Sequence, residues 1–274
     1  MCSDTGGATV PPAAYGFTLA GVGGRFLQPT QDRTRPLLHV DSRAAGTGDP
    51  GPVTRAIKLV DGGRLLLDRP KRIAVYEFAR EVDEDELAHP YLAVAASVMA
   101  GWEGWDPLHA GAFLLPDGRA VAVLGAREDG KSTLLAALAL DGVPVLTDDV
   151  LIHERGVVHA GPRSVDLRPG TEALLPDAPL ESSRSGTRLR LALPPIAPAA
   201  PLAGWVALSW GNEIAIEALR PSRRLWCLAN AHSRAGDPAD DALLELSRLP
   251  GWLLTRPRGA RHLPEIAGRL LALG

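Results

Sequence analysis

Short apolar runs separated by polar or glycine-rich breaks fill the N-terminal part of the chain, a pattern typical of β-strands joined by turns. We expect strands at residues 15–19, 37–40, 55–60, 64–67 and 72–78, a hairpin at Asp61-Gly62-Gly63 and a glycine-rich loop over 44–52. Helical periodicity over residues 84–101 predicts a helix that ends this part of the chain. Residues 1–105 are therefore expected to form a small β-rich region.

Beyond residue 105 the pattern changes, because helix-forming stretches begin to alternate with apolar strand-like runs. We expect strands at residues 108–115, 119–124, 143–146, 204–208, 213–217 and 252–255, and a hairpin over 152–159 that turns at Arg155-Gly156. Helices are expected at 132–140, 223–231, 240–248 and 263–273, and the proline-rich stretch 193–201 is expected to be irregular. This alternation indicates an α/β fold with a mixed sheet, so residues 106–274 form a second predicted domain.

One loop of this second region has a spacing that a phosphate ligand explains. It connects the strand at 119–124 to the helix at 132–140 and has the form GxxxxGK[ST], the phosphate-binding P-loop. Its glycines let backbone N–H groups turn toward phosphates, Lys131 can reach the β- and γ-phosphates of ATP, and the Ser132 hydroxyl can ligate Mg²⁺. The helix N-terminus behind the loop adds a favourable dipole. The residues expected to hold the nucleotide are Gly125, Ala126, Arg127, Glu128, Asp129, Gly130, Lys131, Ser132 and Thr133.

Two adjacent carboxylates, Asp148 and Asp149, follow the strand at 143–146, at the edge where open α/β sheets bind their ligands. One carboxylate can neutralise charge near Mg²⁺, while the other can accept the proton of an attacking hydroxyl. Adjacent residues of a strand face opposite sides, so the pair is expected to divide these roles unless the strand has already ended. The alternative is an Asp-Asp turn or a helix cap.

The composition argues against several classes of function. The chain has 274 residues, 46% of them hydrophobic, and its net charge of −3 offers no general attraction for nucleic acid or for an anionic membrane. No apolar run approaches the roughly 20 residues that span a bilayer, and the first residues lack the pattern of a signal peptide. Cys2 and Cys227 lie far apart in the sequence and do not suggest a disulfide framework. We expect a cytoplasmic protein.

Together these motifs resemble a known family. Residues 108–110 (Leu-His-Ala), the loop at 125–133 and Asp148-Asp149, in this order and spacing, are similar to the core of the HPr kinase/phosphorylase family. The likeness is greater to the stand-alone HPr-kinase-like proteins encoded with ribosomal peptide clusters, lasso-peptide kinases among them. Tyr15-Gly16 near the N-terminus and the tail over 249–265 are similar to those proteins as well. The detailed likeness runs from the histidine to the paired aspartates.

The resemblance implies an ATP-dependent kinase that phosphorylates a serine hydroxyl of a peptide or small protein, such as a ribosomal peptide precursor. It implies that Asp148 is the general base, and that His109, on a strand, belongs to the active site with Lys131. Ser132 is then a Mg²⁺ ligand, and Asp149 is expected to serve the same ion. From the residues alone, His109 is more simply a packed strand residue. The β-rich N-terminal region is a candidate for substrate docking or for contact between copies of a homo-oligomer.

The chain departs from the family's pattern at two points. Glu128 replaces a glycine common in the middle of such loops, and Asp129 follows it, so two carboxylates lie where phosphate oxygens approach, with Arg127 offsetting part of their charge. The family's downstream acidic Mg²⁺ ligand has no clear counterpart, and Asp166, close to Arg168, is the candidate for it. Two alternatives stay open: a nucleotide-binding regulatory or scaffold protein without transfer activity, and a kinase that acts on a small molecule.

Overall fold

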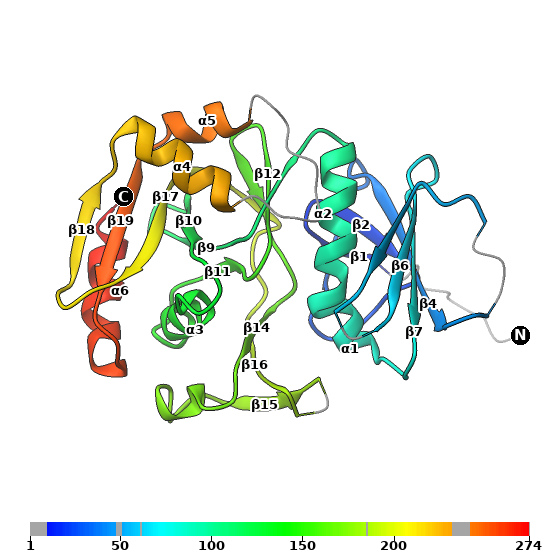
Figure 1. Ribbon diagram of the computed structural model, residues 1–274, viewed down its shortest axis with the longest axis horizontal. Coiled ribbons are helices and arrows are strands. Elements are labelled where there is room, and N and C mark those ends of the chain that lie inside the picture. The colour runs from blue at the N-terminus through cyan, green and yellow to red at the C-terminus, as the bar shows by residue number, and fades with distance from the viewer. Residues whose placement is uncertain (1–9, 48–50, 61, 185, 232–241, 274) are drawn as a thin grey trace, which may run out of the picture.

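The computed structural model describes residues 10–47, 51–60, 62–184, 186–231 and 242–273. These residues form a mixed α/β structure in which two large sheets lie side by side, with helix α2 (Leu92–Trp102) between them (Figure 1). A smaller sheet lies below the second large sheet in the same view. The mixed α/β class expected from the sequence is confirmed.

The N-terminal sheet has the strand order β3-β1-β2-β4-β7-β6-β5, with parallel pairing of β2 to β4 and of β4 to β7. Its inner face and α2 bury one apolar core, which also takes in Val150 and Ile152 from the following region. The division of the chain at residue 105 therefore stays a prediction. Asp61, in the expected hairpin, lies outside the described residues. The strands are β1 (Pro12–Ala14), β2 (Phe17–Ala20), β3 (Gln28–Pro29), β4 (Leu37–Ala44), β5 (Arg55–Lys58), β6 (Arg64–Asp68) and β7 (Ile73–Phe78).

Tyr15 and Gly16, expected within a strand, instead form the turn between β1 and β2. Their φ angles are 56° and 86°, and positive φ at two successive residues closes a tight hairpin. The Tyr15 N–H donates to the carbonyl of Ala160 at 2.7 Å, and the Tyr15 side chain is fully buried. The first hairpin is therefore packed into the second half of the chain.

The helix expected over residues 84–101 is interrupted near its middle. A short helical turn, α1 (Glu84–Glu86), is capped by Asp83, whose carboxylate accepts a backbone N–H at 2.7 Å. A π-helical turn (Leu87–Tyr91) follows, with extended backbone at His89 before Pro90, and α2 continues from there. Proline lacks the N–H that a continuing helix needs, which explains the break.

The second large sheet has the order β11-β9-β10-β17-β13-β12-β8, and β19 and β18 extend it beyond β17. Parallel pairing of β10 with β17 and of β17 with β19, beside antiparallel pairing of β9 with β10, makes it a mixed sheet as expected. The expected hairpin at Arg155-Gly156 is present, with φ angles of 47° and 80°. The strands are β8 (Asp106–Leu108), β9 (Ala110–Leu114), β10 (Ala120–Leu124), β11 (Val145–Thr147), β12 (Leu151–Glu154), β13 (Val157–His159), β17 (Ala199–Trp210), β18 (Ala215–Ala218) and β19 (Gly251–Arg256).

Helices cover both faces of this sheet. On one face, α3 (Lys131–Leu140) and α6 (Leu263–Leu271) share a core with β9, β10 and β17. On the other, α4 (Pro221–Ala231) and α5 (Ala242–Arg248) pack over small and branched side chains of the same strands. Of the helix expected at 240–248, the first two residues lie outside the described part of the chain. No described helix has the length and apolar character that a bilayer crossing requires.

Cys227, on α4, is a half-buried free thiol. Cys2 lies outside the described residues.

His109 is not on a strand, contrary to the expectation from the sequence. The chain bends at His109, so the expected strand at 108–115 is divided into β8, which pairs with β12, and β9, which pairs with β10 and β11. The His109 N–H donates to the carbonyl of Ala231 at the end of α4, at 2.6 Å, which holds the bend in place. The histidine therefore lies at the junction of two strands, at the edge of the sheet where β10 ends.

A small antiparallel sheet, with the order β14-β16-β15, was not expected from the sequence. Its strands are β14 (Ser164–Leu167), β15 (Leu180–Ser183) and β16 (Arg188–Ala192). β14 and β16 do alternate polar and apolar residues, but each is only four or five residues long, and β15 has no such alternation. This sheet forms one wall of the site described next. Two short 3-10 turns complete the described structure, Thr171–Ala173 and Ala260–His262.

Candidate active site at the N-terminus of α3

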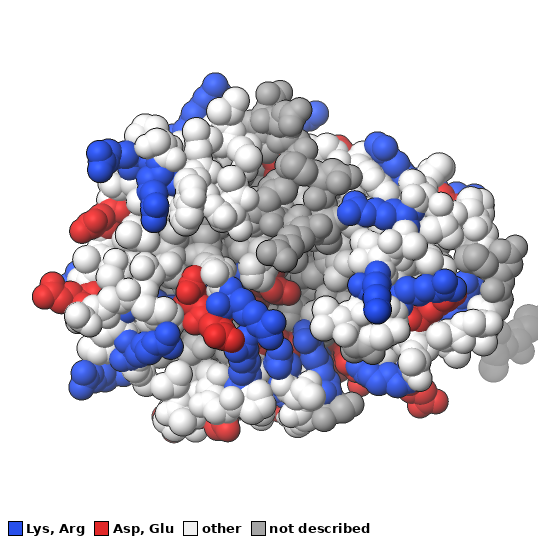
Figure 2. Space-filling model, in the orientation of Figure 1, with Lys and Arg blue, Asp and Glu red and all other residues white. Residues whose placement is uncertain are grey.

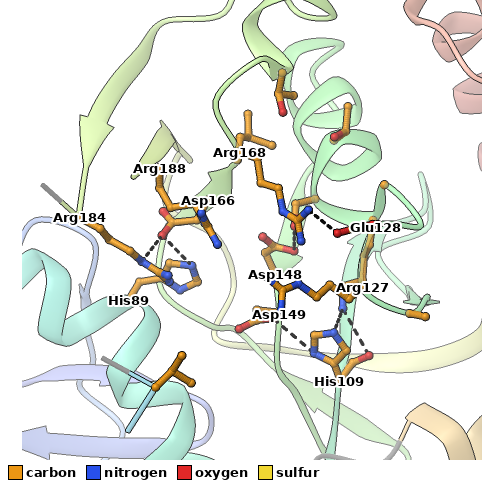
Figure 3. A pocket seen from close by; sticks show the side chains of 18 of the residues that line it. His89, His109, Arg127, Glu128, Asp148, Asp149, Asp166, Arg168, Arg184 and Arg188 are labelled. Atoms are coloured by element: carbon orange, nitrogen blue, oxygen red, sulfur yellow. Dashed lines mark hydrogen bonds and ion pairs between the residues drawn. The ribbon is translucent and has the colours of Figure 1, made fainter. Parts of the chain in front are cut away.

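A cavity of about 830 Å³ lies where β10, β11 and β14 end. Its walls are the glycine-rich loop with the first turn of α3, the two carboxylates after β11, and a group of basic side chains around β14 and β16 (Figure 3). The described residues that line it and were expected in the site are His109, Ala126, Arg127, Glu128, Gly130, Lys131, Ser132, Thr133, Asp148, Asp149, Asp166 and Arg168. Gly125 and Asp129 belong to the same loop but are not among the lining residues.

The loop turns into α3 at Gly130, whose φ is 72°. A Cβ atom at Gly130 would lie 3.1 Å from a guanidinium nitrogen of Arg256 and 3.3 Å from the ring of Trp210, so both space and backbone favour glycine. The same Arg256 nitrogen donates to the carbonyl of Asp129 at 2.5 Å. The Asp129 carboxylate turns back to accept the N–H of Ala126 at 2.7 Å. The loop is thus held from both sides, but one of its N–H groups is already engaged.

Glu128 occupies the position where a glycine was expected, and its φ of 77° is still the angle that glycine adopts most easily. Its carboxylate points into solvent, two-thirds exposed, and forms an ion pair with Arg168 at 2.8 Å. The hydrogen bond from Arg168, and then its charge, hold the pKa of Glu128 below the usual range. The negative charge next to the loop is therefore partly neutralised by the small sheet opposite.

Lys131 and His109 meet at the back of the cavity. The Lys131 ammonium lies 3.2 Å from Nε2 of His109 and 3.4 Å from the His109 carbonyl, and the side chain is buried. Burial lowers the pKa of Lys131, and burial followed by the charge of Lys131 lowers the pKa of His109. Nδ1 of the imidazole lies 3.3 Å from the Asp149 carboxylate. These contacts fit a neutral imidazole that carries its proton on Nδ1 and accepts from the ammonium.

Asp148 and Asp149 follow the end of β11 at Thr147 and point in different directions. The reason is local, because Asp149 has a φ of 69° and so the chain turns between them. The Ser132 hydroxyl donates to Oδ1 of Asp148 at 3.1 Å, whereas Asp149 faces His109. Burial raises the pKa of Asp148 to about 7, although the charge of Lys131 opposes the increase. Asp148 is therefore a carboxyl group that exchanges its proton near neutral pH.

Asp166, the remaining expected metal ligand, lies on β14 and is held by arginines. Its carboxylate pairs with Arg190 at 2.7 Å and with Arg184 at 3.1 Å, and His89 approaches it at 3.8 Å. Burial alone would raise the pKa of Asp166, but the neighbouring charge of His89 and the bonds from Arg190 outweigh it and lower the pKa. Its oxygen atoms already have strong donors, so this residue does not fit a metal ligand.

The remaining oxygen groups fit Mg²⁺ in part. Ser132 and Asp149 both line the cavity and offer a hydroxyl and a carboxylate, the hard oxygen ligands that Mg²⁺ prefers. Among the residues that the structure describes, no group of three or more His, Cys, Asp or Glu side chains is arranged to hold a metal ion. The donor set therefore suits an ion that keeps most of its ligands as water and phosphate oxygens.

Several lining residues were not expected from the sequence. His89, Arg184, Arg188 and Arg258 reach the cavity from the π-helical turn, from the β15–β16 hairpin and from the segment after β19. The available signal was the density of arginine between residues 184 and 190. It was not informative without the small sheet that carries it.

Comparisons with known proteins were made for the whole chain. No protein-family model matches it, and no curated protein matches it. Among solved structures it is similar to the HPr(Ser) kinase/phosphatase from Coxiella burnetii, with 14% sequence identity and a TM-score of 0.31. The similarity covers 61% of this chain and 99% of that chain. A likeness this distant carries no argument about function, which has to come from the site.

Proposed function

We propose that this chain is an ATP-dependent phosphotransferase that transfers the γ-phosphate to a serine hydroxyl of a peptide or small protein. The observation that carries the proposal is the contact between Ser132 and Asp148, which joins the P-loop side of the cavity to a buried carboxyl group with a pKa of about 7. A phosphate site and a proton acceptor tuned to neutral pH are the two groups that phosphoryl transfer to an alcohol needs.

The phosphates belong at the opening of α3. The first turn of α3 lines the cavity, which places the positive end of the helix dipole there. Lys131 leaves its contact with His109 to reach the β- and γ-phosphates, a short movement for a flexible side chain. Ser132 and Asp149 would hold Mg²⁺, which leaves Asp148 free as the base, and the ion would supply neutralisation of the phosphate charge.

The transfer step assigns the proton to Asp148. The serine oxygen of the acceptor forms a bond to the γ-phosphorus of ATP, and the bond from that phosphorus to the β–γ bridging oxygen breaks. ADP leaves with the electron pair of the broken bond, and Asp148 takes the hydroxyl proton of the acceptor. His109 holds Asp149 in place at the rear of the cavity after Lys131 has moved to the phosphates. We assign the β-rich N-terminal part to acceptor docking or to contact between copies of the chain.

Incubation of the purified protein with γ-labelled ATP, Mg²⁺ and a library of serine peptides tests the proposal directly. We expect labelled phosphate on serine and equimolar ADP. Matched peptides with alanine in place of serine should remain unlabelled. ATP binding without labelling of any hydroxyl compound would overturn the transfer function.

A second candidate is a nucleotide-binding regulatory protein without transfer activity. The observation that favours it is the state of the loop, because Asp129 already engages the Ala126 N–H and Glu128 adds negative charge at the entrance. The same labelling experiment separates the two functions. A small-molecule kinase is distinguished by label that appears on added sugars or amino acids and not on peptides.

A further inference from the structure

The cavity carries an excess of positive charge that the phosphate site does not explain. Among its described lining residues, six cationic side chains face four carboxyl groups, whereas the whole chain has a net charge of −3. The cations are Arg127, Lys131, Arg168, Arg184, Arg188 and Arg258, and the carboxyl groups are those of Glu128, Asp148, Asp149 and Asp166. Figure 2 shows basic side chains gathered on this face of the molecule over β14 and β16. The net charge of the cavity lining is therefore positive, whereas the net charge of the whole chain is negative.

The cations fall into two groups on either side of Asp148. Lys131 and Arg127 belong to the loop side, where the nucleotide phosphates are proposed to bind. Arg184 and Arg188 come from the β15–β16 hairpin and lie at the opposite end of the cavity (Figure 3). A general base must contact the acceptor hydroxyl, so the acceptor has to occupy the space between these two groups. Its flanking groups then face the arginines of the hairpin.

Asp166 does not neutralise the positive charge of the hairpin arginines. It faces Arg190 and Arg184 together, two guanidinium groups for one carboxylate. Arg188 donates to the backbone carbonyl of Thr187 at 2.8 Å and forms no ion pair with a carboxylate in the described ranges. Burial, and then the charges of Arg184 and Arg168, lower the pKa of Arg188, which reflects positive groups facing one another. Such a cluster is stabilised when an anion enters it.

A second observation indicates an unfilled polar site at this end. The imidazole of His89 lines the cavity and is 2% exposed, yet its Nδ1 atom has no hydrogen-bond partner within the described part of the chain. Buried polar atoms of this kind normally have partners, so a missing partner points to a ligand or an ordered water. The backbone carbonyl of the same residue is fixed by Arg190 at 2.6 Å, so the ring is held at this wall.

We propose that the cavity selects acceptors in which the serine hydroxyl is flanked by an anionic group, a carboxylate or a phosphate, which binds Arg184 and Arg188. This inference rests on the proposed function for the role of the acceptor, but the anion site itself can be measured without catalysis. It makes the substrate class an acidic peptide, for a chain that is itself acidic overall.

The test is equilibrium binding of fluorescent serine peptides to the full chain in the presence of ADP, which permits no transfer. The first peptide has glutamate on both sides of the acceptor serine, and the second has glutamine at these two positions. The third has phosphoserine at the same two positions. We expect the two anionic peptides to bind about tenfold more tightly than the glutamine peptide at low salt, and the difference to shrink as salt is raised. Equal binding of all three peptides by the wild-type chain would refute the anion site.

Substitution of Arg188 locates the site. Arg188→Gln should reduce the preference to within about twofold, whereas Arg220→Gln, at an exposed position just before α4 and outside the cavity lining, should keep it in full. A preference that persists in Arg188→Gln contradicts the assignment to the hairpin. The wild-type comparison needs no variant to fold, so it decides the matter if the substitution destabilises the chain.

The two proposals can fail separately. Tighter binding of anionic peptides without any phosphorylation supports the anion site and overturns the kinase. Phosphorylation with equal binding of acidic and neutral peptides supports the kinase and overturns the anion site.

Discussion

The hydroxyl of Ser132 donates a hydrogen bond of 3.1 Å to the carboxyl group of Asp148, linking the first turn of α3 to the chain that leaves β11. The two residues are sixteen positions apart in the sequence, and both line the cavity. Their contact places a metal-type ligand and a proton acceptor within one hydrogen bond of each other. The function of the site depends most directly on this pair.

Asp148→Asn should abolish transfer while nucleotide binding is largely retained. The amide cannot accept a proton, and loss of a general base lowers rates by about 10²- to 10⁴-fold. Labelled-phosphate transfer and titration with a fluorescent ATP analogue measure the two properties separately. Transfer by the variant at the wild-type rate would exclude Asp148 as the base.

The same carboxyl group predicts the pH dependence of activity. Only the ionised form of Asp148 can accept a proton, and its pKa is about 7. The value of kcat/KM for Mg·ATP should therefore increase about tenfold per pH unit below pH 7 and level off above it. A flat profile between pH 5.5 and 8.5 would contradict this assignment.

The free energy of unfolding should decrease as pH rises, whereas the activity should increase. The pKa of Asp148 is raised from 3.8 to about 7 on folding, so between these values the folded state binds more protons than the unfolded state. Stability from this group is full below the unfolded value and is lost as pH rises to about 7, by at most about 4 kcal/mol. Urea unfolding at several pH values should give a steeper loss for the wild type than for Asp148→Asn. Identical slopes for the two proteins would show that this pKa is not raised.

Lys131→Ala should weaken nucleotide binding itself. A hydrogen bond to a charged group contributes about 1.5–3 kcal/mol, which corresponds to about a 10- to 100-fold loss of affinity. Lys131→Arg should not restore it, because the planar guanidinium does not fit a space built around a compact ammonium beside His109. Unchanged titration curves for both variants would argue against a phosphate site at this loop.

Glu128→Gly should tighten nucleotide binding by several-fold. The change removes both a negative charge at the loop and a side chain from a residue with a φ of 77°. Glu128→Gln is the matched control, since it removes the charge and keeps the side chain. The charge-dependent part of the gain should fade between 20 and 200 mM salt, and a loss of affinity in Glu128→Gly would mean that the ion pair with Arg168 orders the loop for binding.

Much of the fold follows from local pattern, since the strands around the P-loop, the loop itself and α3 all have strong and simple signals. The hairpin at Arg155-Gly156 could be predicted equally well, because Gly156 lies between two short apolar runs and is a turn signal. The bend at His109 was not, since it depends on a hydrogen bond to Ala231, more than a hundred residues away in the sequence. The residues next to His109 in the sequence do not predict such a long-range contact.

The residues of the candidate site also differ in whether they could be predicted from the sequence. Residues within one motif, such as Lys131 and Ser132, could be assigned to the cavity from spacing, and the structure brings both of them there. Their roles stay predictions until activity is measured. Arg184 and Arg188 could not be assigned, because their position at the cavity depends on how a small sheet pairs and packs, which no local motif specifies. Asp166 was chosen for its position in the sequence, and only its arginine partners show that its charge is already compensated.

The turn at Tyr15 limits how far the two halves of this chain can be separated by protein engineering. Its ring packs beneath Thr147, next to the paired aspartates, since a Cβ on Gly161 would lie 3.1 Å from the ring and 2.3 Å from the Thr147 hydroxyl. A gene fragment that encodes only residues 106–274 would keep every residue of the loop at 125–133. It would lose the Tyr15 ring that packs near Thr147, the residue before Asp148. The part of the chain over residues 106–274 is therefore not expected to keep its site on its own. It should be transplanted into another protein only together with its first hairpin.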